Sequence, residues 1–230
     1  MDATELRAQL EDDLSWRLDE LRHLRNQLLG DLVQDEWPAV SLRTILVMQY
    51  AHLEGFSKVA FALYLDAINS RSLPIGSLQP SLMAAALAKE FKALQAGSST
   101  DDEGTEDRLL RRARKQVAFL ERLRGLNTAT DLKVPEDAVS MEMNVGADII
   151  KRTVFLLGMP EQTFDSRQLS SVEFVKNARN DIAHGSRRDR IPARMFDAHR
   201  VQCERFMADL SRTIARAVVE EWFSIGGAPG

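Results

Sequence analysis

The chain has 230 residues, 44% of them hydrophobic and 28% charged, which is the balance of an ordinary soluble globular protein. This length fits one domain, and we expect a single domain over residues 1–230. The net charge of −4 excludes a uniformly basic nucleic-acid coat but not local basic patches. One cysteine, Cys203, excludes an internal disulfide framework and a multi-cysteine zinc site.

The N-terminal residues argue against export and membrane insertion. The chain opens with MDATELRAQLEDD, which places acids where a signal peptide has basic residues and an apolar run. No segment approaches the ~18 uncharged apolar residues of a membrane span. We therefore expect a cytoplasmic protein with no membrane partner.

Helical periodicity dominates the first half of the chain. Leucines recur at intervals of three and four between residues 6 and 28, which predicts a long amphipathic helix ending near Gly30. A second helix is expected from about 41 to 69, and its dense apolar positions indicate that it lies inside a bundle. A loop over 70–80 and a weaker helix over 81–94 follow.

The second half begins with a polar break and then continues as helices. Residues 96–107 are small, polar and acidic, which predicts a surface loop. Helices are expected at 108–124, which is strongly basic, and at about 145–157, 169–184 and 192–223. Asp165, Ser166 or Ser170 can cap the start of the helix at 169–184, and Gly185 stands where a C-terminal cap belongs. The sequence therefore predicts an all-α bundle of six to seven helices.

Several common enzyme classes lack their sequence signals. The chain contains no GxxxxGK[ST] loop, no GxGxxG turn and no GxSxG elbow. His52-x-Glu54 matches half of a zinc deaminase site, but that site needs two further thiolates. The four histidines never fall at HExxH spacing. We expect neither a metal nor a cofactor.

One segment near the C-terminus has a more informative pattern. Residues 175–185 read VKNARNDIAHG and close an amphipathic helix that basic residues follow. This block resembles the signature of the HEPN superfamily (higher eukaryotes and prokaryotes nucleotide-binding), whose ribonucleases share an Arg, a polar residue and a His four to six positions after the Arg. The spacing alone is not specific, since Arg194 and His199 have the same separation as Arg179 and His184. The resemblance rests on the whole block of residues 175–185 and its place at the end of an amphipathic helix.

The resemblance implies a HEPN-like bundle with its core at about residues 40–225, and residues 1–37 form an added N-terminal helix. It implies that Arg179 binds the phosphate, that His184 transfers protons and that Asn180 positions one or both of them. The early helix of the family often carries an acidic residue that faces this site, and here Glu54 can take that place and pair with Arg179.

Helical geometry adds a constraint on how these residues act together. Arg179 falls within the apolar arc of its helix. Burial of an arginine there costs free energy unless an ion pair compensates its charge or a cleft keeps it hydrated. Arg179 and His184 diverge by about 140° on an ideal helix, so one copy aims them poorly at a single phosphate. Two copies related by a two-fold axis can place both pairs across one cleft, as in the composite sites of the family.

These observations favour a metal-independent endoribonuclease that cleaves single-stranded RNA at a homodimer cleft. Histidine can move the protons of the 2′-hydroxyl and of the leaving 5′-oxygen, and a guanidinium can stabilise the phosphorane. Resemblance also implies a toxin–antitoxin or antiviral (anti-phage) defence setting, with an antitoxin or defence-complex protein as a further partner. The alternatives are a non-catalytic HEPN module that binds RNA, a nucleotide or a protein, and a helical scaffold with an accidental Arg–His pair.

Each site residue also has a structural alternative. Arg179 can be a core arginine ion-paired with Glu54, and His184 can be a helix C-terminal residue that suits the macrodipole. Basic residues after the motif either bind the RNA backbone or form a solvated face; they are Arg187, Arg188, Arg190 and Arg194. The same two interpretations apply to the basic helix at 108–124.

Overall fold

The all-α prediction is confirmed by a computed structural model that describes residues 1–95, 105–126, 133–136, 144–186 and 189–227. These parts hold eight α-helices: α1 (Ala3–Leu29), α2 (Ala39–Asn69), α3 (Pro80–Ala86), α4 (Ala88–Gln95), α5 (Thr105–Leu126), α6 (Ala147–Leu156), α7 (Ser166–Ala183) and α8 (Ala193–Val219). Two short 3₁₀ helices, η1 (Gln34–Glu36) and η2 (Ile75–Ser77), complete them. The described residues form no strand, only an isolated antiparallel bridge between Leu78 and Ser224.

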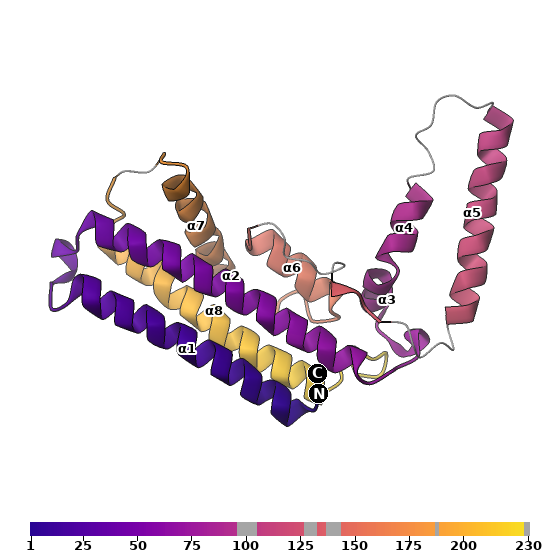
Figure 1. The fold of residues 1–230 in the computed structure, drawn as a ribbon, viewed down its shortest axis with the longest axis horizontal. Helices are drawn as coiled ribbons and strands as arrows, with labels where there is room; N and C mark the ends of the chain where they lie inside the picture. Colours follow the sequence, from indigo (N-terminus) through magenta and orange to yellow (C-terminus); the bar gives the residue numbers. More distant parts are fainter. Residues whose placement is uncertain (96–104, 127–132, 137–143, 187–188, 228–230) are drawn as a thin grey trace.

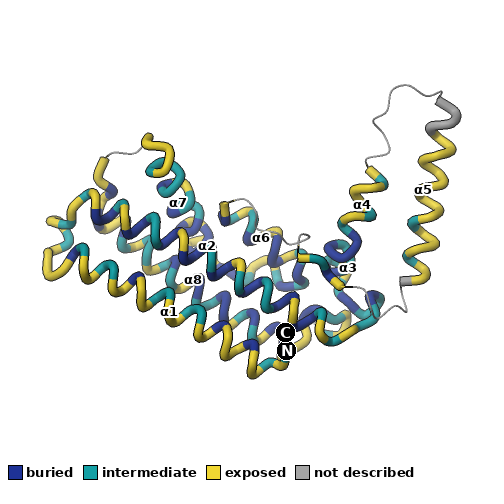
Figure 2. Tube along the Cα trace, in the orientation of Figure 1, coloured by how far each residue is buried: buried dark blue, intermediate teal, exposed yellow. Residues whose placement is uncertain are grey.

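The long helices α1, α2 and α8 run side by side and form the body of the molecule (Figure 1). The buried residues of these helices lie on their facing sides (Figure 2). The fully buried side chains include Leu6, Leu10, Leu42, Leu53, Phe56, Phe206, Leu210 and Ile214. The N-terminal helix is therefore an integral wall of the bundle, because its Leu6, Leu10 and Leu29 are buried in the common core.

Helix α7 packs across α2 and α8, and α6 connects it with α3. Three buried apolar residues, Val172, Val175 and Ala178, turn one side of α7 toward the bundle. The last turn of α7 is closed by Gly185, whose φ of 71° is readily available only to glycine, while the Ser186 N–H donates to the Asp181 carbonyl at 2.9 Å. This confirms the predicted capping role of Gly185, and the helix ends at Ala183, within the candidate motif.

The predicted helix at 81–94 is divided at Leu87, so α3 and α4 are separate helices. Leu87 is buried against the core and leaves helical geometry, with φ −99° and ψ 14°. No glycine or proline stands at this break. The packing of Leu87 into the core accounts for it. The loop predicted at 96–107 lies outside the described residues up to 104, and α5 begins within it at Thr105.

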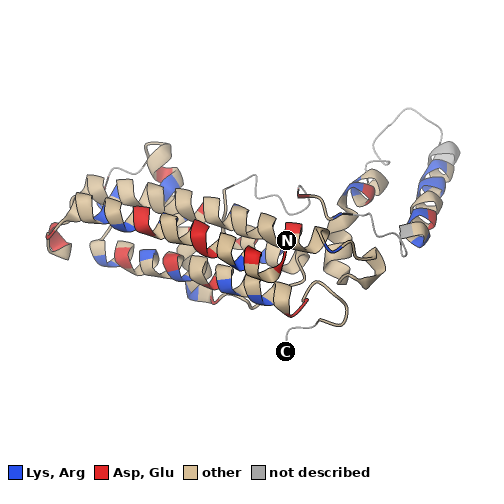
Figure 3. Cartoon of the chain, turned by 60° about the horizontal axis from the view of Figure 1, so that its bottom comes forward, with Lys and Arg blue, Asp and Glu red and all other residues tan. Residues whose placement is uncertain are grey.

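Helix α5 extends away from the bundle and packs on α4 (Figure 1). Phe119 meets Phe91 with ring centroids 5.5 Å apart, and Arg122 pairs with Glu90 at 2.8 Å. Lysine and arginine residues, blue in Figure 3, recur along the described part of α5. They are exposed, as a solvated face requires, and binding of nucleic acid by this helix stays a prediction. None of the described helices combines the length and apolar content needed to cross a lipid bilayer.

The N-terminus of α7 is fixed by a capping box. The Asp165 carboxylate accepts from the Gln168 N–H at 2.8 Å, and the Gln168 side chain accepts from the Asp165 N–H at 3.1 Å. We expect Asp165→Ala to lower the free energy of unfolding by about 1 kcal/mol. Urea denaturation followed by circular dichroism measures the change. Ser166→Ala, one residue later and outside the box, is the control, and equal losses in both variants would contradict the role of the cap.

Candidate functional site

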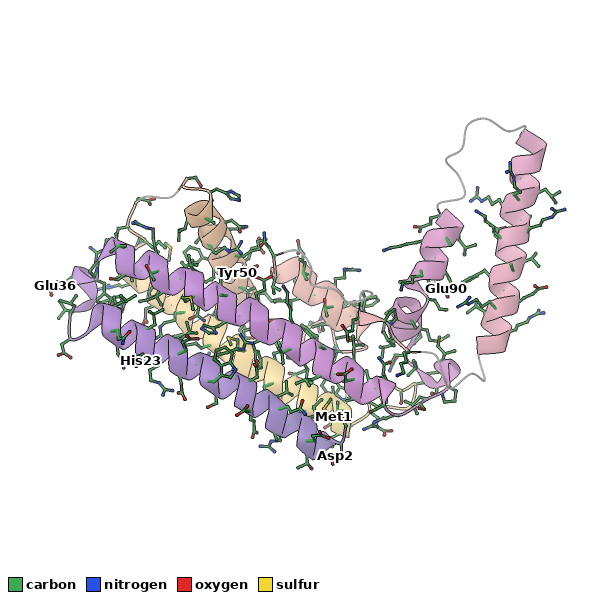
Figure 4. The ribbon with its side chains drawn as sticks, viewed as in Figure 1. Met1, Asp2, His23, Glu36, Tyr50 and Glu90 are labelled. Atoms are coloured by element: carbon green, nitrogen blue, oxygen red, sulfur yellow. The ribbon has the colours of Figure 1, made fainter. Side chains whose placement is uncertain are left out.

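Arg179 lies half-buried at the edge of the contact between α7 and α2. Its guanidinium carbon lies 4.8 Å from the centre of the Tyr50 ring. Tyr50 belongs to α2 and is only 1% exposed. Figure 4 labels Tyr50 on the side of α2 next to α7. A cation over an aromatic face is attracted by the ring quadrupole, so Tyr50 supports Arg179 without neutralising its charge.

Two asparagine side chains hold one end of the same guanidinium. The Nη1 group of Arg179 donates to the Asn180 Oδ1 at 2.9 Å and to the Asn144 Oδ1 at 3.2 Å. Nη1 carries two hydrogens, so both are in use. The Nε–H and the Nη2 group make no hydrogen bond with any described residue. This edge of the fork matches the two oxygens of a phosphate in a bidentate contact.

Arg179 has no carboxylate partner among the described residues, and the expected pair with Glu54 is not formed. Glu54 instead pairs with Lys58, one turn later on α2, at 2.8 Å. The alternative of a core arginine ion-paired with Glu54 is therefore wrong in this structure. The i,i+4 spacing of Glu54 and Lys58 favours this local pair over a partner on another helix.

The Tyr50 hydroxyl is buried close to Glu54 and makes no hydrogen bond of normal geometry with the described residues. Burial raises the pKa of Tyr50 well above its usual value, the Glu54 carboxylate raises it further, and Arg179 acts in the opposite direction. The phenol is therefore neutral at physiological pH. Its contribution to the site is its ring and not its hydroxyl as a base.

Asn144 reaches Arg179 because the residues after it are pinned to α7. Val145 is completely buried, and the Ala147 N–H donates to the Glu173 carboxylate at 3.2 Å. At Gly146 the contact is so close that a Cβ atom would lie 2.7 Å from Glu173 Oε2. Hydrogen bonds from the Lys176 ammonium and the Ala147 N–H lower the pKa of Glu173, which keeps this anchor ionised.

Asn144 was not predicted as a site residue. It stands 35 residues before Arg179, directly ahead of the helix expected at 145–157, and belongs to no motif. Only the folding of the segment 144–147 onto α7 brings it to the guanidinium. The one available signal was the glycine at 146, where the side chains of Glu173 and Lys176 approach the backbone closely.

His184 occupies the C-terminal cap of α7 and is exposed. Its backbone N–H donates to the Asn180 carbonyl at 2.9 Å, whereas its ring makes no hydrogen bond with the described residues. The Asn180 side chain contacts Arg179 and does not orient His184. The structure thus joins Arg179 to Asn180 and keeps His184 out of their hydrogen-bond network, in agreement with the divergence expected along one helix.

Of the basic residues after the motif, the structure describes Arg190 but not Arg187 or Arg188. Arg190 donates through Nη2 to the Asp35 carbonyl at 2.5 Å and so ties this segment to η1. Arg187 and Arg188 lie outside the described residues, and their role as RNA ligands stays a prediction.

Two of the other histidines are partly or fully enclosed by packing. The His52 Nε2 lies 3.0 Å from a Glu20 oxygen, and its ring meets Trp16 edge to face. His199 stacks on Phe174 with ring centroids 3.9 Å apart, and burial lowers the pKa of both histidines. These contacts support a structural role for both side chains. The described residues contain no group of three side chains arranged to hold a metal ion.

Comparison with known proteins assigns the chain to a family. The sequence model of the MAE_28990-like HEPN family matches residues 6–223, nearly the whole chain. The chain belongs to this HEPN family. No curated protein and no solved structure is significantly similar to it. The HEPN match begins within α1, so the family's sequence includes the helix that we expected to lie outside the core.

Proposed function

We propose that this HEPN protein is a metal-independent endoribonuclease that cleaves single-stranded RNA. One observation carries the proposal: Arg179 is held by Tyr50, Asn144 and Asn180, none of which neutralises it, and its Nε and Nη2 edge has no partner among the described residues. A preorganised cation of this kind suits the charge that develops on a phosphorane.

The chemistry uses the nucleophile that RNA already carries. The 2′-oxygen attacks the adjacent phosphorus, and the bond from phosphorus to the 5′-oxygen breaks. A neutral His184 ring takes the proton of the 2′-hydroxyl, and a protonated His184 ring gives one to the leaving 5′-oxygen. The products are a 2′,3′-cyclic phosphate and a 5′-hydroxyl. DNA has no 2′-hydroxyl, so we expect it to resist cleavage.

We propose further that the site is composite and that two copies form it. Within one chain Arg179 faces α2, whereas His184 is exposed at the end of α7 and shares no hydrogen bond with it. An apolar groove beside this helix end is lined by Val40, Val47, Met48 and Ile182. Val40 is 62% exposed there, which suits burial against a second copy.

The cellular setting rests on family resemblance alone. We propose a role in a toxin–antitoxin or anti-phage defence system, with an antitoxin or defence-complex protein as partner. Expression of the wild-type protein is then expected to slow bacterial growth, and Arg179→Ala is expected to relieve the effect.

Incubation of purified protein with single-stranded RNA in EDTA tests the activity. We expect the wild type to cleave, and we expect Arg179→Ala and His184→Ala to remain folded and inactive. Asn26→Ala is the matched control, because Asn26 is an exposed asparagine on α1 and makes no contact with Arg179 or with the Glu173 anchor. RNA binding without cleavage by the wild type would favour the alternative of a non-catalytic HEPN module. That alternative has one supporting observation, the isolation of the His184 ring from the Arg179 network.

A further inference from the structure

We infer that Asn144 is a phosphate-binding residue that forms, with Asn180 and Arg179, one donor surface for an RNA phosphodiester. The inference rests on the proposed function, since it concerns the substrate of the same site. It adds a residue from outside the Arg–His motif, contributed by the segment that leads into α6.

The hydrogen-bond directions give Asn144 this role. Each asparagine amide has one carbonyl acceptor and an NH₂ group with two donors. The carbonyl oxygens of Asn144 and Asn180 both accept from the Nη1 of Arg179. Their NH₂ groups make no hydrogen bond with any described residue. Two amide groups therefore lie beside the Nη1 end of the guanidinium with their NH₂ donors unused by the described residues, and Asn144 is exposed to solvent.

The ligand class follows from these donors. The free edge of Arg179 and the two NH₂ groups offer only N–H donors, and no carboxylate is paired with this arginine among the described residues. Non-bridging phosphate oxygens are anionic acceptors with several lone pairs, so the phosphodiester backbone of an RNA can accept from the free edge of Arg179 and from the amides beside it. Hydrogen bonds to such a charged group contribute more than neutral ones.

The backbone that follows Asn144 is held against α7 by several contacts. The burial of Val145, the close fit of Gly146 and the bond from Ala147 to Glu173 fix the backbone immediately after it. Binding of a phosphate therefore requires little ordering of this segment, which is an advantage for affinity. If Asn144 only oriented Arg179, it would use its carbonyl oxygen, and the Asn144 NH₂ group would then contact no substrate.

The test uses a short mixed-sequence 2′-O-methyl oligoribonucleotide, which binds as RNA but lacks the nucleophile. Proton–nitrogen NMR spectra of the full chain report the side-chain NH₂ signals of Asn144 and Asn180, assigned from the spectra of the alanine variants. We expect both signals to shift when the oligonucleotide is added. Fluorescence anisotropy is expected to give roughly tenfold weaker binding for Asn144→Ala, while Asn26→Ala, at an exposed position of α1, binds as the wild type does.

The outcomes separate this inference from the proposed function. If the wild type binds the oligonucleotide but the Asn144 signal stays in place, or if Asn144→Ala binds equally well, the role of Asn144 is overturned and the ribonuclease proposal stands. A wild-type protein that binds no oligonucleotide overturns both. Shifted signals and weakened binding support the inference even if natural RNA is bound and not cleaved.

Discussion

Replacement of Arg179 by lysine is expected to lower the rate of RNA cleavage by about a hundredfold or more, although the positive charge is kept. The guanidinium makes two kinds of contact, since its face lies on Tyr50 and its Nη1 bonds Asn144 and Asn180. Its remaining edge has no partner among the described residues and binds the phosphate in the proposed site. An ammonium group is a point charge without a planar fork and cannot reproduce this arrangement. Single-turnover cleavage in EDTA measures the loss.

The control for this substitution is Arg212→Lys on α8. Arg212 is exposed, pairs with Asp209 and belongs to a different part of the surface. We expect this variant to cleave as the wild type does. If the Arg179 variant also cleaved at the wild-type rate, positive charge alone would suffice, and the asparagine contacts would have no catalytic meaning.

Phe206→Ala is expected to lower the free energy of unfolding by about 3–5 kcal/mol. Phe206 is completely buried on α8, and its ring meets that of Phe164 edge to face with centroids 4.8 Å apart. Its removal leaves a cavity at the point where α8 supports the segment that enters α7. A domain is typically stable by about 5–15 kcal/mol, so the variant is expected to be only marginally folded. Guanidinium denaturation measures the difference.

Val219→Ala provides the comparison on the same helix, because Val219 is 67% exposed. We expect a change within about 0.5 kcal/mol there. Similar losses at both positions would mean that α8 does not pack as described and that Phe206 does not occupy the core.

The sequence predicted those helices whose own side chains define a buried face. The leucine spacing of α1 and the apolar density of α2 mark their packed sides. The residue block around Arg179 resembles the HEPN signature, and the family model that matches residues 6–223 confirms the family. The break at Leu87 was missed, because the core pulls this leucine inward and no glycine or proline announces the change. The spacing of residues along the chain predicts each helix, whereas the break at Leu87 depends on packing against other segments.

The candidate site was predicted in part for the same reason. Asn180 is next to Arg179 in the chain, so its involvement was visible, although its predicted contact with His184 was not found. Asn144 and Tyr50 come from other segments, and only the tertiary fold brings them to the guanidinium. The predicted pair of Glu54 with Arg179 was wrong, because Lys58 lies one turn away and competes for the same carboxylate.

The most direct test of the composite site mixes two inactive variants. Arg179→Ala and His184→Ala are refolded together so that mixed dimers form, and RNA cleavage in EDTA is measured for the mixture and for each variant alone. In a mixed dimer, the His184 of one copy and the Arg179 of the other are both intact. We predict that the mixture regains part of the wild-type activity while each variant alone stays inactive. A mixture that contains mixed dimers by native mass spectrometry and is as inactive as its parents would contradict the proposed site.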